Sequence, residues 1–194
     1  MRRPRSPISS SPKKSLADTE LRRWTIRPAR ADDAGALALV AGATLLETFH
    51  DAIPAADLVA HATGKSSPDA FRAWIADEAS AVFYVGADGT DAPVGYAVLT
   101  TPDFPAEALR SGDIELRRIY TLAATHGTGL GPALMELAVG EARTRRHGRV
   151  LLGVHPENHR ARRFYERCGF VVVGERSFTV GESRFTDPIY ALDL

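Results

Sequence analysis

A glycine-rich segment near the middle of the chain constrains its fold more than any other feature. It reads His126-Gly127-Thr128-Gly129-Leu130-Gly131-Pro132 and lies between a strand-like run, residues 113–121, and an amphipathic run that begins at Pro132. In a strand–loop–helix arrangement, backbone N–H groups converge on the positive end of the helix dipole and bind anions. Glycine suits such a loop because a Cβ would hold phosphate groups away from the backbone, and proline fits the first helical turn. The segment therefore predicts a phosphate-binding loop.

Length and charge set the class of protein. The 194 residues suffice for one domain with a hydrophobic core, or for one domain plus a tail. The formal net charge is zero, so the chain as a whole has no electrostatic preference for nucleic acid or membranes. No run of 18 apolar residues is present, and the single cysteine, Cys168, excludes an internal disulfide. We predict a cytoplasmic protein without a membrane-spanning segment.

The first 20 residues differ from the rest in composition. Residues 1–20 are mostly Ser, Pro, Arg and Lys, and such a stretch cannot bury enough apolar surface to offset its ordering entropy. We expect a disordered basic tail, followed by a single domain over residues 21–194. A nucleic-acid-binding arm is one interpretation of the tail. A dispensable segment or a misassigned start is favoured, because no basic face accompanies it.

The remaining chain alternates between strand and helix patterns. An Asp88-Gly89 pair predicts a hairpin turn, residues 101–112 a loop, and Asp32-Asp33 the N-cap of the first helix. Two antiparallel-type strands followed by alternating strands and helices indicate a mixed α/β sheet. Strands are expected at residues 24–27, 81–86, 94–99, 113–121, 150–154, 170–174 and 188–192, and helices at 34–49, 55–62, 67–75, 132–146 and 158–168.

Metal chemistry is not indicated. The six histidines show no metal-ligand spacing on a shared helix face, and no cysteine or carboxylate cluster supports them. We expect no metal ion.

A second motif follows the glycine segment and specifies the class of ligand. It reads Asn158-His159-Arg160-Ala161-Arg162-Arg163-Phe164-Tyr165-Glu166-Arg167-Cys168-Gly169-Phe170. Together and in this order, the two motifs resemble the GNAT superfamily of acetyl-CoA-dependent N-acetyltransferases, over roughly residues 24–194. A narrower likeness is to bacterial spermidine/spermine acetyltransferases of the PaiA type. It is carried by Thr48-Phe49, residues 115–120 and the tail Ser177-Phe178…Gly181…Thr186-Asp187.

The resemblance implies a mixed sheet with helices on both faces and a splayed strand pair that holds acetyl-CoA. The glycines would bring backbone amides to the coenzyme A pyrophosphate, and residues 119–121 would pair with the pantetheine arm like an extra strand. Asn158 would bond the pantetheine or an ordered water. His126 stands where the family usually has Gln or Arg, so pyrophosphate affinity is expected to be weaker or pH-dependent. The implied cofactor-binding residues are Ile119, Tyr120, Thr121, His126, Gly127, Thr128, Gly129, Leu130, Gly131, Pro132 and Asn158.

Two residues are implied to carry the proton transfers. A tyrosine keeps its proton at neutral pH, so Tyr165 is the candidate acid for the departing thiolate; the alternative is a core aromatic beside Phe164. Glu115 is the candidate base, acting through water: the resemblance implies this role because Glu115 matches the position of the family's usual glutamate, and it lies six residues before Thr121, on the same strand face. The alternative is a solvated carboxylate paired with Arg117. Direct attack by the amine is preferred over a covalent step at Cys168, whose position indicates packing.

The acceptor site is expected at Glu47, Thr48, Phe49, Tyr120 and Asp187. Its two carboxylates suit a cationic amine, or are plain surface charges. The predicted function is transfer of an acetyl group to a small primary amine, with a polyamine as the leading acceptor. Amino acids, peptide N-termini and antibiotic amines stay open. A rival is a non-catalytic acyl-CoA-binding regulator whose basic tail contacts nucleic acid. Monomer and homodimer are both left open.

Overall fold

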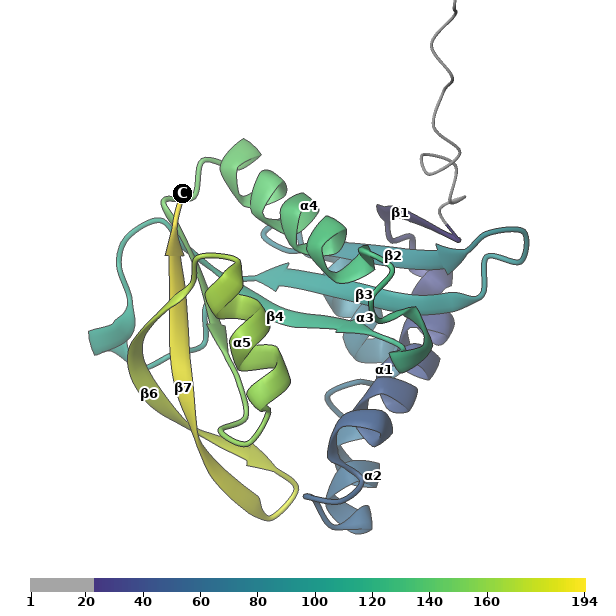
Figure 1. Ribbon diagram of the computed structural model, residues 1–194, viewed down its shortest axis with the longest axis horizontal. Helices are drawn as coiled ribbons and strands as arrows, with labels where there is room; N and C mark the ends of the chain where they lie inside the picture. Colours follow the sequence, from purple (N-terminus) through teal and green to yellow (C-terminus); the bar gives the residue numbers. More distant parts are fainter. Residues whose placement is uncertain (1–22) are drawn as a thin grey trace, which may run out of the picture.

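The computed structural model describes residues 23–194, so the predicted tail over residues 1–20 lies outside the described residues. Seven strands form one sheet in the order β1-β2-β3-β4-β5-β7-β6 (Figure 1). Only β4 and β5 pair in parallel, which confirms the predicted mixed sheet. The strands are β1 Trp24–Pro28, β2 Ala81–Ala87, β3 Pro93–Thr100, β4 Asp113–Thr121, β5 Arg149–Gly153, β6 Val171–Val180 and β7 Ser183–Asp193.

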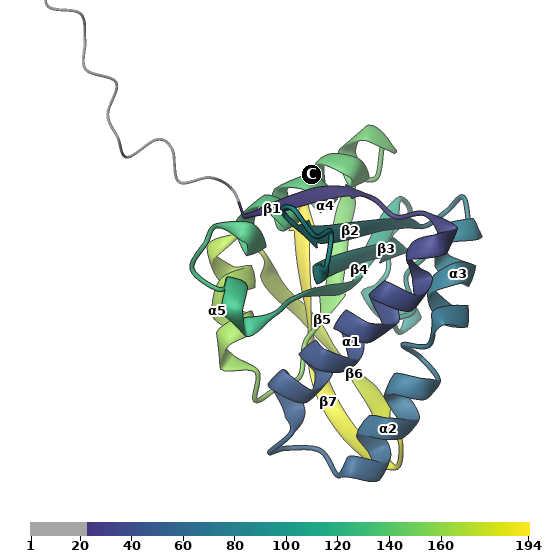
Figure 2. The ribbon, with the colours of Figure 1, turned by 90° about the vertical axis from the view of Figure 1, so that its right-hand side faces the viewer.

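Helices cover both faces of the sheet, as predicted (Figure 2). On one face, α1 and α3 enclose a core around Leu37, Phe71 and Tyr96. On the other, α4 and α5 enclose a core around Leu134 and Phe170. Within residues 23–194, no helix has the length and apolar character needed to cross a bilayer. The helices are α1 Ala34–Phe49, α2 Ala55–Thr63, α3 Pro68–Ala76, α4 Leu130–Thr144 and α5 His159–Arg167, with short 3-10 turns η2 Ala31–Asp33, η3 Ala106–Ala108 and η4 Ala123–Thr125.

The N-cap prediction for α1 was wrong, although the helix bounds were right. The Asp33 side chain caps no N–H of α1. Its carboxylate instead accepts hydrogen bonds from the Arg27 guanidinium at 2.6 and 2.9 Å and from the Arg30 backbone N–H at 2.7 Å. The Asp33 carboxylate therefore pairs with Arg27 of β1, whereas the local sequence pattern predicted that it would cap α1.

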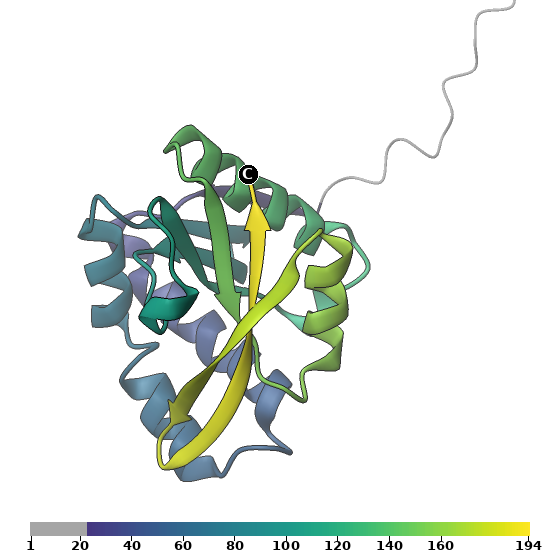
Figure 3. The ribbon, with the colours of Figure 1, turned by 90° about the vertical axis from the view of Figure 1, so that its left-hand side faces the viewer.

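The C-terminal strands are much longer than predicted. β6 and β7 form one twisted hairpin that turns at Gly181 and reaches α2 (Figure 3). Along its distal half β6 alternates, with Arg176, Phe178 and Val180 less exposed than their neighbours. The predicted strand ended at residue 174, whereas β6 continues to Val180 with Arg176 at one of these inward positions. The burial of this arginine depends on a carboxylate from a distant strand, which a local pattern does not reveal.

A splay between β4 and β5 opens the sheet at its centre. The two strands pair only where residues 113–115 of β4 face residues 149–151 of β5. Beyond that point, β4 continues to Thr121 paired with β3 alone. This register confirms the predicted splay and leaves one edge of β4 unpaired over its second half.

A bulge in β4 changes which side chains share a face. Val98 of β3 lies opposite Arg118, and Leu99 lies opposite Leu116, so Arg117 has no partner across the strand pair. An extra residue of this kind inverts the in–out alternation. Glu115 therefore shares a face with Arg118 and not with Thr121, and the same-face argument for Glu115 was wrong.

Candidate active site

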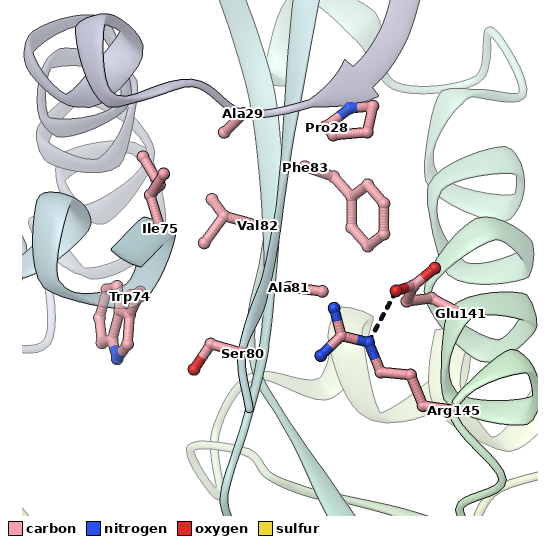
Figure 4. A pocket seen from close by; sticks show the side chains of 10 residues that line it. All are labelled: Pro28, Ala29, Trp74, Ile75, Ser80, Ala81, Val82, Phe83, Glu141 and Arg145. Carbon is pink, nitrogen blue, oxygen red and sulfur yellow. Dashed lines mark hydrogen bonds and ion pairs between the residues drawn. The ribbon is translucent and has the colours of Figure 1, made fainter. Parts of the chain in front are cut away.

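A cavity of about 710 Å³ occupies the splay between β4 and β5. Its wall runs from the glycine segment, along α5 and β4, to a chamber enclosed by the end of α1, α2 and the β6–β7 hairpin. A smaller hollow of about 190 Å³ straddles β2, with Trp74 on one side and the Glu141–Arg145 pair on the other (Figure 4). Because only the larger cavity reaches the glycine segment, it is the candidate active site.

The glycine segment joins a strand to a helix, as predicted, but the reason for glycine at two of its positions is backbone conformation as well as space for a ligand. Gly127 and Gly129 have φ angles of +82° and +83°, a left-handed conformation that L side chains rarely adopt. A Cβ at either position would meet no protein atom within 4 Å, so within the protein the requirement is conformational. Gly129 caps α4, which begins at Leu130 and not at Pro132 as predicted. The unpaired N–H groups of that first turn supply anion donors.

Positive charge near this loop comes from arginines that sequence reasoning did not single out. His126 hydrogen-bonds the Thr121 carbonyl oxygen through Nε2 at 3.2 Å, and burial together with Arg160 lowers its pKa below the usual value. His126 is therefore neutral at pH 7. Arg160 and Arg167 of α5 line the same cavity. Glycine backbone, helix N-terminus and two guanidinium groups together fit a ligand that carries phosphates.

The cavity wall includes most of the predicted cofactor residues. Thr128 and Leu130 are the exceptions: the Thr128 hydroxyl donates to the Thr125 carbonyl at 2.7 Å, and Leu130 is fully buried in the core. Asn158 caps α5, its Oδ1 accepting from the Ala161 N–H at 3.0 Å, and its amide NH2 is left to donate to a ligand. The predicted cofactor residues in the wall are Ile119, Tyr120, Thr121, His126, Gly127, Gly129, Gly131, Pro132 and Asn158.

Tyr165 belongs both to the core and to the cavity wall. Its ring contacts the rings of Phe164, Phe170 and Tyr190, and 8% of the residue is exposed. Burial raises the pKa of its phenol, so the hydroxyl keeps its proton at neutral pH. The neighbouring Phe164 also lines the cavity, so both aromatic side chains belong to the cavity wall.

Glu115 is fully engaged by other groups. Its Oε2 accepts from the Arg117 guanidinium at 2.8 Å and from the Asp103 N–H at 3.1 Å, while Oε1 accepts from Arg176 at 3.3 Å. Burial raises its pKa and the two arginines oppose that rise. The pair with Arg117 is present, but in a buried setting and not on a solvated strand. Glu115 is absent from the cavity wall among residues 23–194.

Asp187 reaches the wall from β7. It is 3% exposed, and its Oδ2 lies 3.9 Å from Nε of Arg176, whose guanidinium is held between the rings of Phe104 and Phe178. Its Oδ1 is buried and finds no hydrogen-bond partner in the described part of the chain. Burial raises the Asp187 pKa, opposed by the charges of Arg176 and His155. A buried carboxylate oxygen without a partner in a cavity wall can accept a hydrogen bond from an N–H or O–H group of a ligand.

The predicted acceptor residues at the end of α1 also line the cavity. The Glu47 carboxylate accepts from the Ala123 N–H at 2.9 Å, and the Thr48 hydroxyl donates to the Thr44 carbonyl at 2.7 Å. Phe49 is buried, with its ring edge-on to His155. The structure thus brings all these residues to one chamber, where Glu47 and Thr48 also serve local structure.

Fold and cavity together define a class of protein in which a phosphate-bearing ligand fits a slot between two splayed strands. Comparisons with known proteins identify the family. The profile of the "Acetyltransferase (GNAT) family" matches residues 45–170. An uncharacterized N-acetyltransferase of Mycobacterium bovis is 32% identical over 162 residues, 84% of this chain and 98% of the relative. A 5-NmdU N-acetyltransferase of Pseudomonas phage PaMx11 is 39% identical over 36% of this chain and 47% of its own length.

Solved structures share the fold. PaiA N-acetyltransferase from Thermoplasma acidophilum, in complex with coenzyme A, superposes with a TM-score of 0.71 at 19% identity, covering 88% of this chain and 99% of the other. The ribosomal-protein-S18-alanine N-acetyltransferase from Escherichia coli gives 0.63 at 20% identity, covering 88% and 93%.

The chain belongs to the GNAT family of acetyltransferases. It is an acetyl-CoA-dependent N-acetyltransferase, and the predicted class, fold and cofactor are confirmed.

Proposed function

We propose that this enzyme transfers the acetyl group directly to a primary amine while both substrates occupy the cavity. One observation carries the proposal: a single 710 Å³ cavity joins the glycine segment to a chamber that holds the buried Asp187 carboxylate, with Tyr165 in its wall. Acetyl-CoA supplies an activated acyl group as a thioester. The glycine backbone, Arg160 and Arg167 would hold its phosphates, and the unpaired edge of β4 its pantetheine arm.

Tyr165 is the proposed general acid. Its raised pKa keeps the phenol protonated, and its place in the wall allows donation to a leaving thiolate. Cys168 is not needed in this scheme, because burial raises the pKa of its thiol and so lowers the thiolate fraction.

Two carboxylates are candidates for the base. Glu115 fits the position expected from the family, but a proton would have to reach it through water past Arg117 or Arg176, since both hold its oxygens. Asp187 lines the cavity, and one of its oxygens has no partner among residues 23–194. The geometry favours Asp187 as the group that receives the ammonium and takes its proton.

A polyamine acceptor is the finer proposal. It draws on the short PaiA-type motifs and on the carboxylates of Glu47 and Asp187 in the chamber. Amino acids, peptide N-termini and antibiotic amines are the alternatives. Arginine side chains also line the chamber, and their positive charge would repel a polyamine.

Thiol release from acetyl-CoA, measured over a panel of primary amines, tests the proposed activity. We expect turnover that requires both substrates, with intersecting initial-rate lines typical of a ternary complex. Tight acetyl-CoA binding without turnover on any amine would replace the enzyme proposal with the acyl-CoA-binding regulator.

A further inference from the structure

Three arginines line the acceptor chamber, and one of them differs from the others. Arg117 and Arg176 share the buried carboxylate of Glu115, and Asp103 and Asp187 also approach them, at 3.7 and 3.9 Å. Arg118 has no carboxylate within 4 Å in the described part of the chain. A half-buried guanidinium without a counter-charge is costly unless another group supplies one.

Neutral groups hold Arg118 in place. Its Nη1 lies 3.1 Å from His61 Nε2 and 3.3 Å from the Ser66 hydroxyl, and its Nη2 lies 3.5 Å from the Lys65 carbonyl. Burial and the charge of Arg118 lower the pKa of His61 to about 4, so the imidazole is neutral and does not compensate the guanidinium. These contacts tie Arg118 to α2 and the turn after it, and such a fixed fork suits a planar anion.

The rest of the chamber provides complementary surfaces. Asp187, with its unpartnered Oδ1, and Arg118 both line this cavity, so a buried carboxylate and a guanidinium without a carboxylate partner among the described residues share one chamber. Leu45, Ile53 and Phe178 supply an apolar wall. A polyamine would place its second cationic end near Arg118, which is unfavourable.

We propose that Arg118 binds a carboxylate of the acceptor, so that the acceptor is an amino acid with an apolar side chain and not a polyamine. Asp187 would receive its amino group. This inference depends on the proposed N-acetyltransferase function of the same cavity.

Matched acceptor pairs test the inference. Phenylalanine with phenethylamine, and leucine with 3-methylbutylamine, differ only by the carboxylate, and spermidine represents the polyamines. We expect kcat/KM at least tenfold higher for each amino acid than for its amine. Arg118→Gln should raise KM for the amino acid about tenfold to 100-fold and leave the amine unchanged, because it removes a charged hydrogen-bond partner. Arg118→Lys should restore part of the loss, and Arg72→Gln, which alters an exposed pair with Asp69, should change neither substrate.

Failure of the inference and failure of the proposed function give different results. Equal rates within each pair, a preference for spermidine, or an equal loss for both pair members in Arg118→Gln would overturn the carboxylate subsite while the enzyme proposal stands. If no amine is acetylated, calorimetry on the coenzyme A-loaded protein compares N-acetylphenylalanine with N-acetylphenethylamine. Tighter binding of the acid, lost in Arg118→Gln, would support the subsite. Equal or weaker binding of the acid would contradict it.

Discussion

Tyr165 shows how a single residue combines packing with proposed chemistry. Three aromatic neighbours fix its ring, and the surrounding apolar atoms raise the pKa of its phenol. A rigid, protonated hydroxyl in the cavity wall is well placed to donate a proton without reorganisation.

Tyr165→Phe therefore removes only the donor. We expect kcat to fall by about 10²- to 10³-fold, the usual contribution of general acid catalysis, with the coenzyme A Kd unchanged. Steady-state thiol release and calorimetry measure the two quantities. An unchanged kcat would remove Tyr165 from the acid role.

The two candidate bases should respond differently to loss of charge. Asp187→Asn keeps the size and shape of the side chain but removes the carboxylate, one oxygen of which has no partner among the described residues. We expect this variant to lower kcat and to abolish the acidic limb of the pH–rate profile. Glu115→Gln leaves Arg117 and Arg176 with a weakened buried partner, so its main effect should be a lower melting temperature. Loss of the acidic limb in Glu115→Gln alone would return the base role to Glu115.

His61 makes a pH-dependent contribution to stability. Its pKa is lowered to about 4 in the folded state, from 6.5 when exposed, so the unfolded chain binds the extra proton between these values. The stabilising contribution is complete above pH 6.5 and is lost as the pH falls toward 4, by about 3 kcal/mol in total. Urea unfolding across this window should show a shallower pH dependence for His61→Gln, while His50→Gln, at an exposed position, should follow the wild type. Parallel curves for His61→Gln and wild type would exclude this contribution.

At the scale of elements, the join between β4 and α4 is determined by backbone conformation. Gly129 has a φ of +83° at the N-cap of α4. Gly140 has ordinary helical geometry inside the same helix, and a methyl group added there would meet no atom within 4 Å. Adding a methyl group should therefore lower the stability of the protein at Gly129 and raise it at Gly140.

Gly129→Ala should destabilise the protein by about 1 kcal/mol and weaken coenzyme A binding, because alanine resists the left-handed conformation. Gly140→Ala should stabilise it by up to about 1 kcal/mol and leave binding unchanged, because alanine favours the helix interior. Denaturant unfolding and calorimetry test both variants. A Gly129→Ala protein with wild-type affinity would show that the loop tolerates another conformation.

At the scale of the whole molecule, the acceptor chamber depends on contact between segments far apart in the sequence. Asp57 of α2 accepts hydrogen bonds from the Glu182 N–H at 3.0 Å and the Ser183 hydroxyl at 2.6 Å, at the tip of the β6–β7 hairpin (Figure 3). Hydrogen bonding lowers the pKa of Asp57, so this contact persists at neutral pH.

Asp57→Ala should release the hairpin tip from α2. We expect a lower melting temperature and a several-fold higher acceptor KM, with the coenzyme A Kd unchanged, because the glycine segment lies at the other end of the cavity. Asp69→Ala, at an exposed pair on α3, serves as the control. Equal changes in the two binding constants would show that the hairpin supports the whole cavity.

Local patterns predicted much of this molecule. Apolar periodicity and turn residues located α1, β4 and the splayed strand β5, and two motifs identified the family and its cofactor. They failed where burial depends on a distant partner. Asp33 pairs with Arg27 instead of capping α1. Arg176 lies on the less exposed face of the β6–β7 hairpin because the Glu115 carboxylate compensates its charge.

The sequence alone determined most of the elements, the order of strand, glycine segment and helix, and the class of enzyme, because these depend on neighbouring residues and on motifs contiguous in the chain. Only the tertiary structure decided the acceptor chamber. The one-residue bulge at Arg117 inverted the alternation of β4, set Glu115 among arginines, and left Arg118 in the cavity wall without a carboxylate partner among the described residues. Register and charge pairing are properties of strands brought together by folding, so no local pattern contains them.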